Sequence, residues 1–126
     1  MREIEFRGQN INGHWAHGNL AIIKEKLDRA EIGTYISNSA GAPFAYQVRP
    51  ETIGQYTGLK DKNGNKIFEG DVGWDEHNEC YGVVKFEDAK FLYLWENIAE
   101  NLWEVADDIE ICGNIHENPE LLEGTE

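Results

Sequence analysis

The sequence predicts a mainly β fold made of short antiparallel strands. Short runs alternate between apolar and polar residues, a pattern typical of strands that bury one face. Glycine, asparagine and aspartate gather between these runs, as they do in tight turns. We expect an N-terminal β meander over residues 1–56 and an SH3-like small barrel with one short C-terminal helical turn over residues 57–126, packed as one compact unit.

The first half of the chain is expected to form short strands joined by polar loops. The expected strands are residues 1–7, 14–23, 32–36 and 44–48. Residues 24–31 are expected to form a solvated loop or a single helical turn, and residues 37–43 form a loop rich in Ser, Asn, Gly and Pro. His14 and His17 should point to opposite faces of the second strand, because successive side chains alternate.

A β-hairpin is expected within residues 53–71, which read IGQYTGLKDKNGNKIFEGD. At its centre, Asn63-Gly64 is the dipeptide best suited to the positive φ angles of a two-residue type I′ turn. Gly58 and Gly70 flank the hairpin, where we expect the chain to bend or to adopt positive φ. Counting outward from the turn predicts the cross-strand pairs Lys62–Asn65, Asp61–Lys66, Lys60–Ile67 and Leu59–Phe68.

The second half is expected to add further strands and one helical turn. The expected strands are residues 72–74, 81–86, 91–95 and 109–112. Residues 91–95 are apolar at every position, which suits a central strand covered on both faces. Residues 96–106 fit helical spacing as well as a strand, and the β surroundings favour a loop followed by a short strand at 102–105. Pro119 suits the first position of a helical turn over residues 120–122.

The net charge of −13 is concentrated toward the C-terminus. Residues 91–126 hold ten carboxylates and no Lys or Arg. Direct binding to a nucleic-acid backbone needs concentrated positive charge, so this composition disfavours it. We interpret the acidic third as a solvated surface, and the alternative is a polyanion-like surface that docks on a basic partner. No apolar run approaches the length of a membrane span, and we expect a cytoplasmic protein without membrane contact.

The residue types used in metal binding and catalysis each have a structural interpretation here. His77-x-x-Cys80 and Cys112-x-x-x-His116 have the ligand types and spacings of a zinc site, but free cysteines are more often small buried hydrophobes. Residues 61–72 begin like a calcium loop and lack its glycine and its final glutamate. Because no nucleophile stands in a recognisable catalytic context, we expect a non-enzymatic protein with reduced thiols, no metal and no cofactor.

Several polar and aromatic residues in and beside the hairpin are candidates for binding. They are Gln55, Tyr56, Thr57, Asp61, Asp71 and Trp74. The first three lie between Gly54 and Gly58, where the backbone can approach a partner closely. In the alternative interpretation, Tyr56 packs in the core while Gln55 and Thr57 satisfy turn amides.

Four segments carry a resemblance to a known family: MREIEFRG at the start, VRPETIGQYTGLKDKNGNKIFEGD, GVVKFED and ADDIEICGNIHENPELL. In this order they cover a little under half of the chain, which resembles the YopX family of phage and prophage proteins. The resemblance implies a mostly β protein, encoded by a phage or an integrated prophage and acting in a bacterial cytoplasm. It implies no biochemical activity.

The first functional hypothesis is therefore a phage accessory protein that self-associates or binds a host protein. Short strands leave sheet edges that are usually covered, and forming a homo-oligomer is one way to cover them. The alternative is an acidic decoy, whose carboxylates mimic nucleic acid and inhibit a host DNA-binding enzyme.

Overall fold

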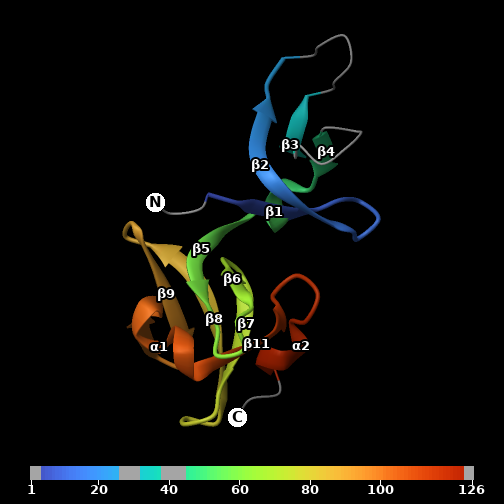
Figure 1. Ribbon diagram of the computed structural model, residues 1–126. Helices are drawn as coiled ribbons and strands as arrows, with labels where there is room; N and C mark the ends of the chain where they lie inside the picture. Colours follow the sequence, from blue (N-terminus) through green and yellow to red (C-terminus); the bar gives the residue numbers. More distant parts are fainter. Residues whose placement is uncertain (1–3, 26–31, 38–44, 124–126) are drawn as a thin grey trace. The chain divides into compact units, whose positions relative to one another are not determined.

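The computed structural model describes residues 4–25, 32–37 and 45–123. The chain folds into two compact units, residues 1–55 and 56–126. Antiparallel strands dominate the described part, which confirms the mainly β prediction (Figure 1). The helices in this part of the chain are short, and none is long and apolar enough to cross a membrane.

The first unit is an antiparallel sheet with the strand order β4-β3-β2-β1-β5. Its elements are β1 (Phe6–Gln9), β2 (Trp15–Ile23), β3 (Gly33–Ser37), β4 (Ala45–Val48), the 3₁₀ turn η1 (Pro50–Thr52) and the start of β5 (Gly54–Lys60). Ile36 and Val48 are the apolar side chains that this unit buries most deeply among its described residues.

Strand β1 differs from the expected strand over residues 1–7. It pairs with β2 from Phe6 opposite Gly18 to Gln9 opposite Trp15, so Gln9 lies in the strand and not in the following turn. Residues 1–3 lie outside the described part, as do most of the loops expected at 24–31 and 37–43.

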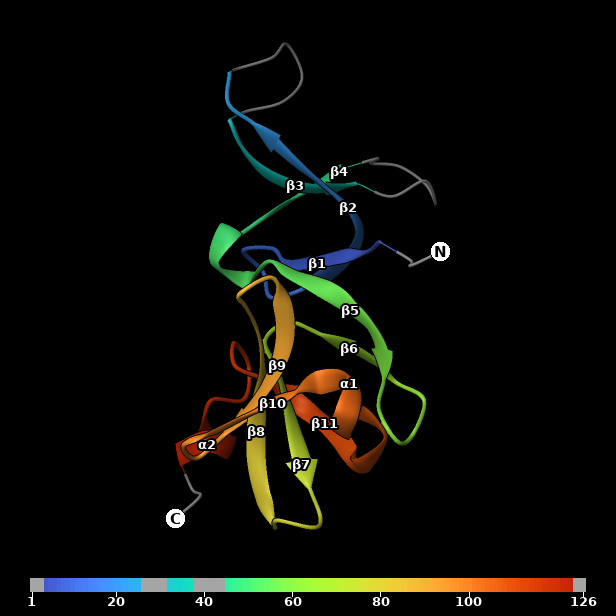
Figure 2. The same cartoon turned by 90° about the vertical axis from the view of Figure 1, so that its left-hand side faces the viewer.

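The second unit is an open five-stranded sheet with the order β10-β9-β8-β7-β11. Its elements are β6 (Lys66–Phe68), β7 (Asp71–Asp75), β8 (Cys80–Glu87), β9 (Lys90–Trp95), β10 (Ile98–Asn101), α1 (Leu102–Val105), the 3₁₀ turn η2 (Ala106–Asp108), β11 (Ile109–Asn114) and α2 (Glu120–Glu123). Because the end strands β10 and β11 do not pair, the described residues form no closed SH3-like barrel. Helices α1 and α2 lie on opposite sides of the sheet (Figures 1 and 2).

The core of the second unit surrounds the ring of Tyr93, which is fully buried. This ring lies over two glycines that face each other on neighbouring strands, Gly73 and Gly82. Its hydroxyl donates a hydrogen bond to the carbonyl of Gly73 at 2.9 Å, so the buried phenol is satisfied. The other buried members of this cluster are Ile67, Val84, Leu102, Ala106 and Ile109.

A three-residue turn closes the β5–β6 hairpin, so the prediction of a two-residue type I′ turn is wrong. Asp61 donates its backbone N–H to the carbonyl of Asn65 at 2.9 Å, and Gly64 donates to the carbonyl of Asp61 at 3.0 Å. This is a type I turn followed by a glycine in the left-handed region, and Gly64 has the expected positive φ of 85°. Lys60 therefore lies opposite Lys66, so the expected pairs beside the turn are one residue out of register, and Phe68 lies opposite Tyr56 in place of Leu59.

The glycines that flank this hairpin adopt positive φ as expected, 86° at Gly58 and 92° at Gly70. The register of β5 and β6 shifts between the Tyr56–Phe68 pair and the Lys60–Lys66 pair. Between these pairs β5 has more residues than β6, which is a β-bulge, and Gly58 lies within it.

Residues 96–106 form a strand followed by a helix, so the prediction of a short strand at 102–105 is wrong. Strand β10 ends at Asn101, and α1 begins at Leu102. Leu102 and Ala106 are both buried, whereas Trp103 and Glu104 between them are exposed. The spacing of four buries one side of a helical turn, and this packing favours the helix over the strand. The expected C-terminal helical turn is confirmed as α2.

Candidate functional site

Most of the candidate binding residues predicted from the sequence make packing contacts or hydrogen bonds inside the second unit, near the point where the chain enters it. Tyr56 packs against Phe68 with ring centroids 5.5 Å apart, and the Thr57 hydroxyl donates to the carbonyl of Ile67 at 2.8 Å. The Asp71 carboxylate accepts the backbone N–H of Phe68 at 2.8 Å. These three side chains are buried, whereas Gln55 is half-buried at the end of the first unit.

Trp74 is half-buried on β7 and does not join the other candidates. Its indole meets the ring of Tyr81, the facing residue on β8, with centroids 4.8 Å apart. The structure therefore supplies a packing or hydrogen-bonding partner on another strand for each of Tyr56, Thr57, Asp71 and Trp74.

Asp61 organises the turn after β5. One carboxylate oxygen accepts the backbone N–H groups of Asn63 and Asn65, each at 2.9 Å. The other oxygen accepts the N–H of Ile111 from β11, also at 2.9 Å. Burial by itself would raise the pKa of this carboxyl, but these three N–H groups and the Asn65 side chain outweigh burial and lower the pKa below its usual value.

We expect acid to destabilise the protein partly through Asp61. Because its folded-state pKa is lowered, the ionised carboxylate stabilises the fold, and this contribution is fully present above the unfolded pKa and lost as the pH falls through the folded pKa. Urea unfolding of the native protein and of Asp61→Asn, from neutral pH down past about pH 4, measures the effect. The difference in the free energy of unfolding should shrink as the pH falls. A constant difference would show that ionisation contributes nothing.

The cysteines and histidines of the possible zinc site occupy different environments. Cys80 is buried opposite Asp75, whereas Cys112 is exposed on β11. Burial raises the pKa of the Cys80 thiol, and the nearby carboxylates, Asp75 first, raise it further, so the thiol is protonated at neutral pH. His77 is exposed in the turn between β7 and β8. The described residues contain no group of three or more potential ligands that could hold a metal ion.

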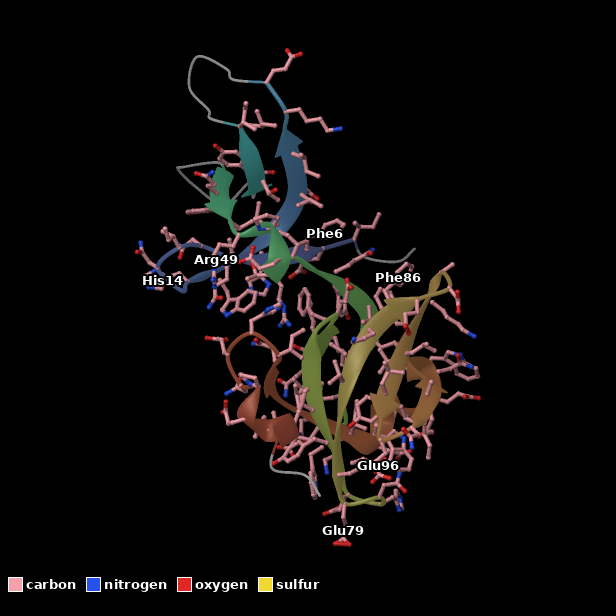
Figure 3. The ribbon with its side chains drawn as sticks, turned by 180° about the vertical axis from the view of Figure 1, so that it is seen from behind. Phe6, His14, Arg49, Glu79, Phe86 and Glu96 are labelled. Carbon is pink, nitrogen blue, oxygen red and sulfur yellow. The ribbon has the colours of Figure 1, made fainter. Side chains whose placement is uncertain are left out.

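A half-open hollow of about 410 Å³ in the first unit is a site that the sequence did not predict. Its lining comes from the β1–β2 turn, β2 and β4: Asn10, His14, Trp15, Ala16, His17 and Tyr46. His14 lies at the end of the β1–β2 hairpin (Figure 3). The two histidines were expected on opposite faces of a strand. Both line the same hollow, as do Trp15 and Ala16 between them, so strand alternation alone does not decide which side chains border it.

The β1–β2 turn that carries His14 is fixed by the Asn10 side chain. Its carbonyl oxygen accepts the backbone N–H groups of Asn12 and His14, each at 2.9 Å. Gly13 completes the turn with a φ of 88°. The pattern Asn-x-Asn-Gly before a strand was the sequence signal for this turn, because a side-chain acceptor at the first position favours it.

A buried glutamine ties this turn to the rest of the first unit. The Gln9 side chain donates to the carbonyl of Gly13 at 3.1 Å and accepts a hydrogen bond from the Arg49 guanidinium. Its backbone N–H donates to the Thr52 hydroxyl at 2.8 Å, and its carbonyl accepts the N–H of Arg49, also at 2.8 Å. These hydrogen bonds join the β1–β2 turn and the end of β1 to η1.

Charged groups flank two of the lining side chains. The Arg7 guanidinium lies 4.9 Å from the ring centroid of Trp15, and Nδ1 of His17 lies 3.2 Å from a Glu5 carboxylate oxygen. Ile11, in the turn beside His14, is 88% exposed. The site thus combines aromatic surface, two imidazoles and an exposed aliphatic side chain, which are groups that recognise proteins.

The whole described fold resembles those of known proteins. The family model described as YopX protein matches residues 5–123. The crystal structure of protein EF1440 from Enterococcus faecalis is similar, with a TM-score of 0.61 and 23% sequence identity over 97% of this chain and 99% of that chain. At this identity the likeness shows the fold. No curated protein matches the chain.

Proposed function

This chain belongs to the YopX family, and we propose that it is a non-enzymatic, protein-binding accessory module of a phage or prophage, acting in the bacterial cytoplasm. The YopX family is not a known enzyme family. The proposed partner is another protein, either from the host or a second copy of this chain, and its extended segment occupies the hollow of the first unit.

The observation that carries this proposal is the hollow itself. Its volume of about 410 Å³ falls in the range of binding sites. Trp15 and Tyr46 supply rigid aromatic surface, and such residues dominate the energetics of protein interfaces. His14, His17 and Asn10 add hydrogen-bonding groups that can orient a peptide backbone. The first unit holds six acidic and six basic residues, so its neutral charge suits an uncharged segment better than a phosphate backbone.

Trp15→Ala should weaken binding at least about tenfold, the loss expected when an aromatic anchor is removed. The test uses peptides selected from a displayed library on the purified full chain, with their affinities then measured by calorimetry. Trp103→Ala is the matched control, because Trp103 is 69% exposed and belongs to the second unit. Its affinity for the same peptides should not change.

Thermal melts of both variants show whether the folds are intact. Peptides that bind Trp15→Ala as well as the native protein, or that lose affinity only for Trp103→Ala, would contradict the proposed site. Light scattering tests self-association: a native oligomer that becomes a monomer in Trp15→Ala would identify the partner as a second copy.

The charge distribution favours a second candidate function, the acidic decoy. Residues 56–126 hold eighteen acidic and five basic residues, so the whole net charge of −13 belongs to the second unit. The strand pairing brings several exposed carboxylates to the same end of the sheet, where Figure 3 shows Glu79 and Glu96. The others at this end are Glu76, Asp107 and Asp108. A decoy would capture DNA-binding proteins from host lysate at low salt and release them at high salt.

A further inference from the structure

Two turns of this chain share one hydrogen-bonded geometry, and both contain an Asn-Gly pair. Residues 10–14 read Asn-Ile-Asn-Gly-His, and residues 61–65 read Asp-Lys-Asn-Gly-Asn. In each turn the backbone N–H of the first residue donates to the carbonyl of the fifth residue at 2.9 Å, and the glycine N–H donates to the carbonyl of the first residue at 3.0 Å. The glycine φ angles are 88° and 85°. The chain therefore presents the same reactive dipeptide twice in the same local conformation.

An asparagine followed by glycine is chemically labile because no glycine side chain hinders the attack of its backbone nitrogen on the asparagine side chain. Asn12 and Asn63 are both exposed, so water reaches both. In each turn, however, the glycine N–H donates a hydrogen bond to the carbonyl of the first residue of the turn. The turn must open locally before the glycine nitrogen can attack, and the ease of opening sets the rate.

The two turns differ in their attachment to the rest of the fold. Among the described residues, the hydrogen bonds of the turn 10–14 join only residues 9–14, and the turn is linked to the rest of its unit indirectly, through the Gln9 side chain that also accepts a hydrogen bond from Arg49. The turn 61–65 is also bound to β11, through the N–H of Ile111 donated to the Asp61 carboxylate at 2.9 Å and the N–H of Lys62 donated to the Ile109 carbonyl at 3.0 Å. Opening the second turn therefore breaks direct hydrogen bonds to a distant strand, whereas the described bonds of the first turn reach the rest of its unit only by way of Gln9.

We propose that Asn12 is a site of spontaneous deamidation in the folded protein and that the fold protects Asn63. The backbone nitrogen of Gly13, losing its proton, forms a bond to Cγ of Asn12. The bond from Cγ to the side-chain nitrogen breaks, and ammonia leaves with that proton. One water molecule then opens the resulting succinimide to aspartate or isoaspartate at position 12. The reaction consumes one water, releases one ammonia and involves no redox change.

The product alters the turn whose residues Asn10 and His14 line the hollow. Either product adds a carboxylate between Asn10 and His14, and isoaspartate also adds a methylene to the backbone of a turn whose amides are hydrogen-bonded to Asn10. The modification goes beyond the proposed binding function and does not depend on it.

Peptide mapping by mass spectrometry tests the proposal on the full chain kept in mildly alkaline buffer. The peptide that contains residue 12 should exchange an amide NH₂ for OH at least about tenfold faster than the peptide that contains residue 63, which corresponds to about 1.4 kcal/mol of additional opening free energy. In concentrated denaturant the two sites should react at similar rates, since both are Asn-Gly. The variant Asn12→Gln should remove the fast reaction.

Equal rates in the folded protein, or a faster reaction at residue 63, would overturn the proposal. So would a folded protein in which residue 12 stays intact while the denatured chain reacts.

Discussion

Gly82→Ala is expected to lower the free energy of unfolding by about 3 kcal/mol or more, through overpacking of the second unit's core. A Cβ at this position would lie 2.6 Å from Cε2 and 2.8 Å from the hydroxyl oxygen of Tyr93. The ring is fully buried among Val84, Ile109 and their neighbours, so it has no open space into which to move. Urea unfolding followed by circular dichroism measures the loss.

Gly73→Ala is the matched control for this prediction. Gly73 faces Gly82 across the β7–β8 pair, but a Cβ there would lie 3.2 Å from Cε1 of Tyr93 and 3.3 Å from Cδ1 of Ile109, a much milder overlap than the one at Gly82. Its cost should be clearly smaller. In the double variant Gly82→Ala, Tyr93→Leu, the two costs should be less than additive, because the smaller side chain removes the clash. Strict additivity would show that the ring is not the cause.

Asp61→Ala is the second large effect that we expect, a loss of about 3 kcal/mol in the free energy of unfolding. The substitution removes the acceptor of three backbone N–H groups, and a hydrogen bond to a charged group is worth about 1.5–3 kcal/mol. Water can replace the carboxylate at the exposed Asn63 and Asn65, so the loss comes mainly from the link to Ile111. The measurement is again urea unfolding at neutral pH.

Asn10→Ala provides the comparison, because Asn10 holds the equivalent place in the other turn. Its side chain accepts two N–H groups within its own turn, at exposed positions, and we expect a loss of about 1 kcal/mol. If Asn10→Ala and Asp61→Ala lower the free energy of unfolding by the same amount, the hydrogen bond from Asp61 to β11 would add no stability beyond that of the bonds within the turn.

The residues of the β5–β6 hairpin show how far local sequence determines structure. Asn-Gly placed the turn correctly and implied positive φ at Gly64, because few residues tolerate that conformation. The register depended on Asp61, which accepts the turn amides and also binds Ile111 from a strand fifty positions away in the chain. A carboxylate with that distant partner stabilises the three-residue turn, and no local pattern reveals the partner.

Burial decided the structure of residues 102–105 in the same way. The sequence fitted helix and strand alike, and the helix forms because it places Leu102 and Ala106 together in the core around Tyr93. Similarly, the alternation in β2 was readable from the sequence, but it did not predict that His14 and His17 would line one hollow, because Tyr46 of the separate strand β4 also borders that hollow.

The sequence by itself determined the β class, the YopX relationship, most strand positions and the glycine turns, since these follow from alternation and backbone conformation over a few residues. Only the tertiary structure decided the register of the hairpin, the helix at residues 102–105, the open sheet and the hollow. Each of these depends on which distant groups share a buried surface or a hydrogen bond, and a linear pattern of side chains does not contain that information.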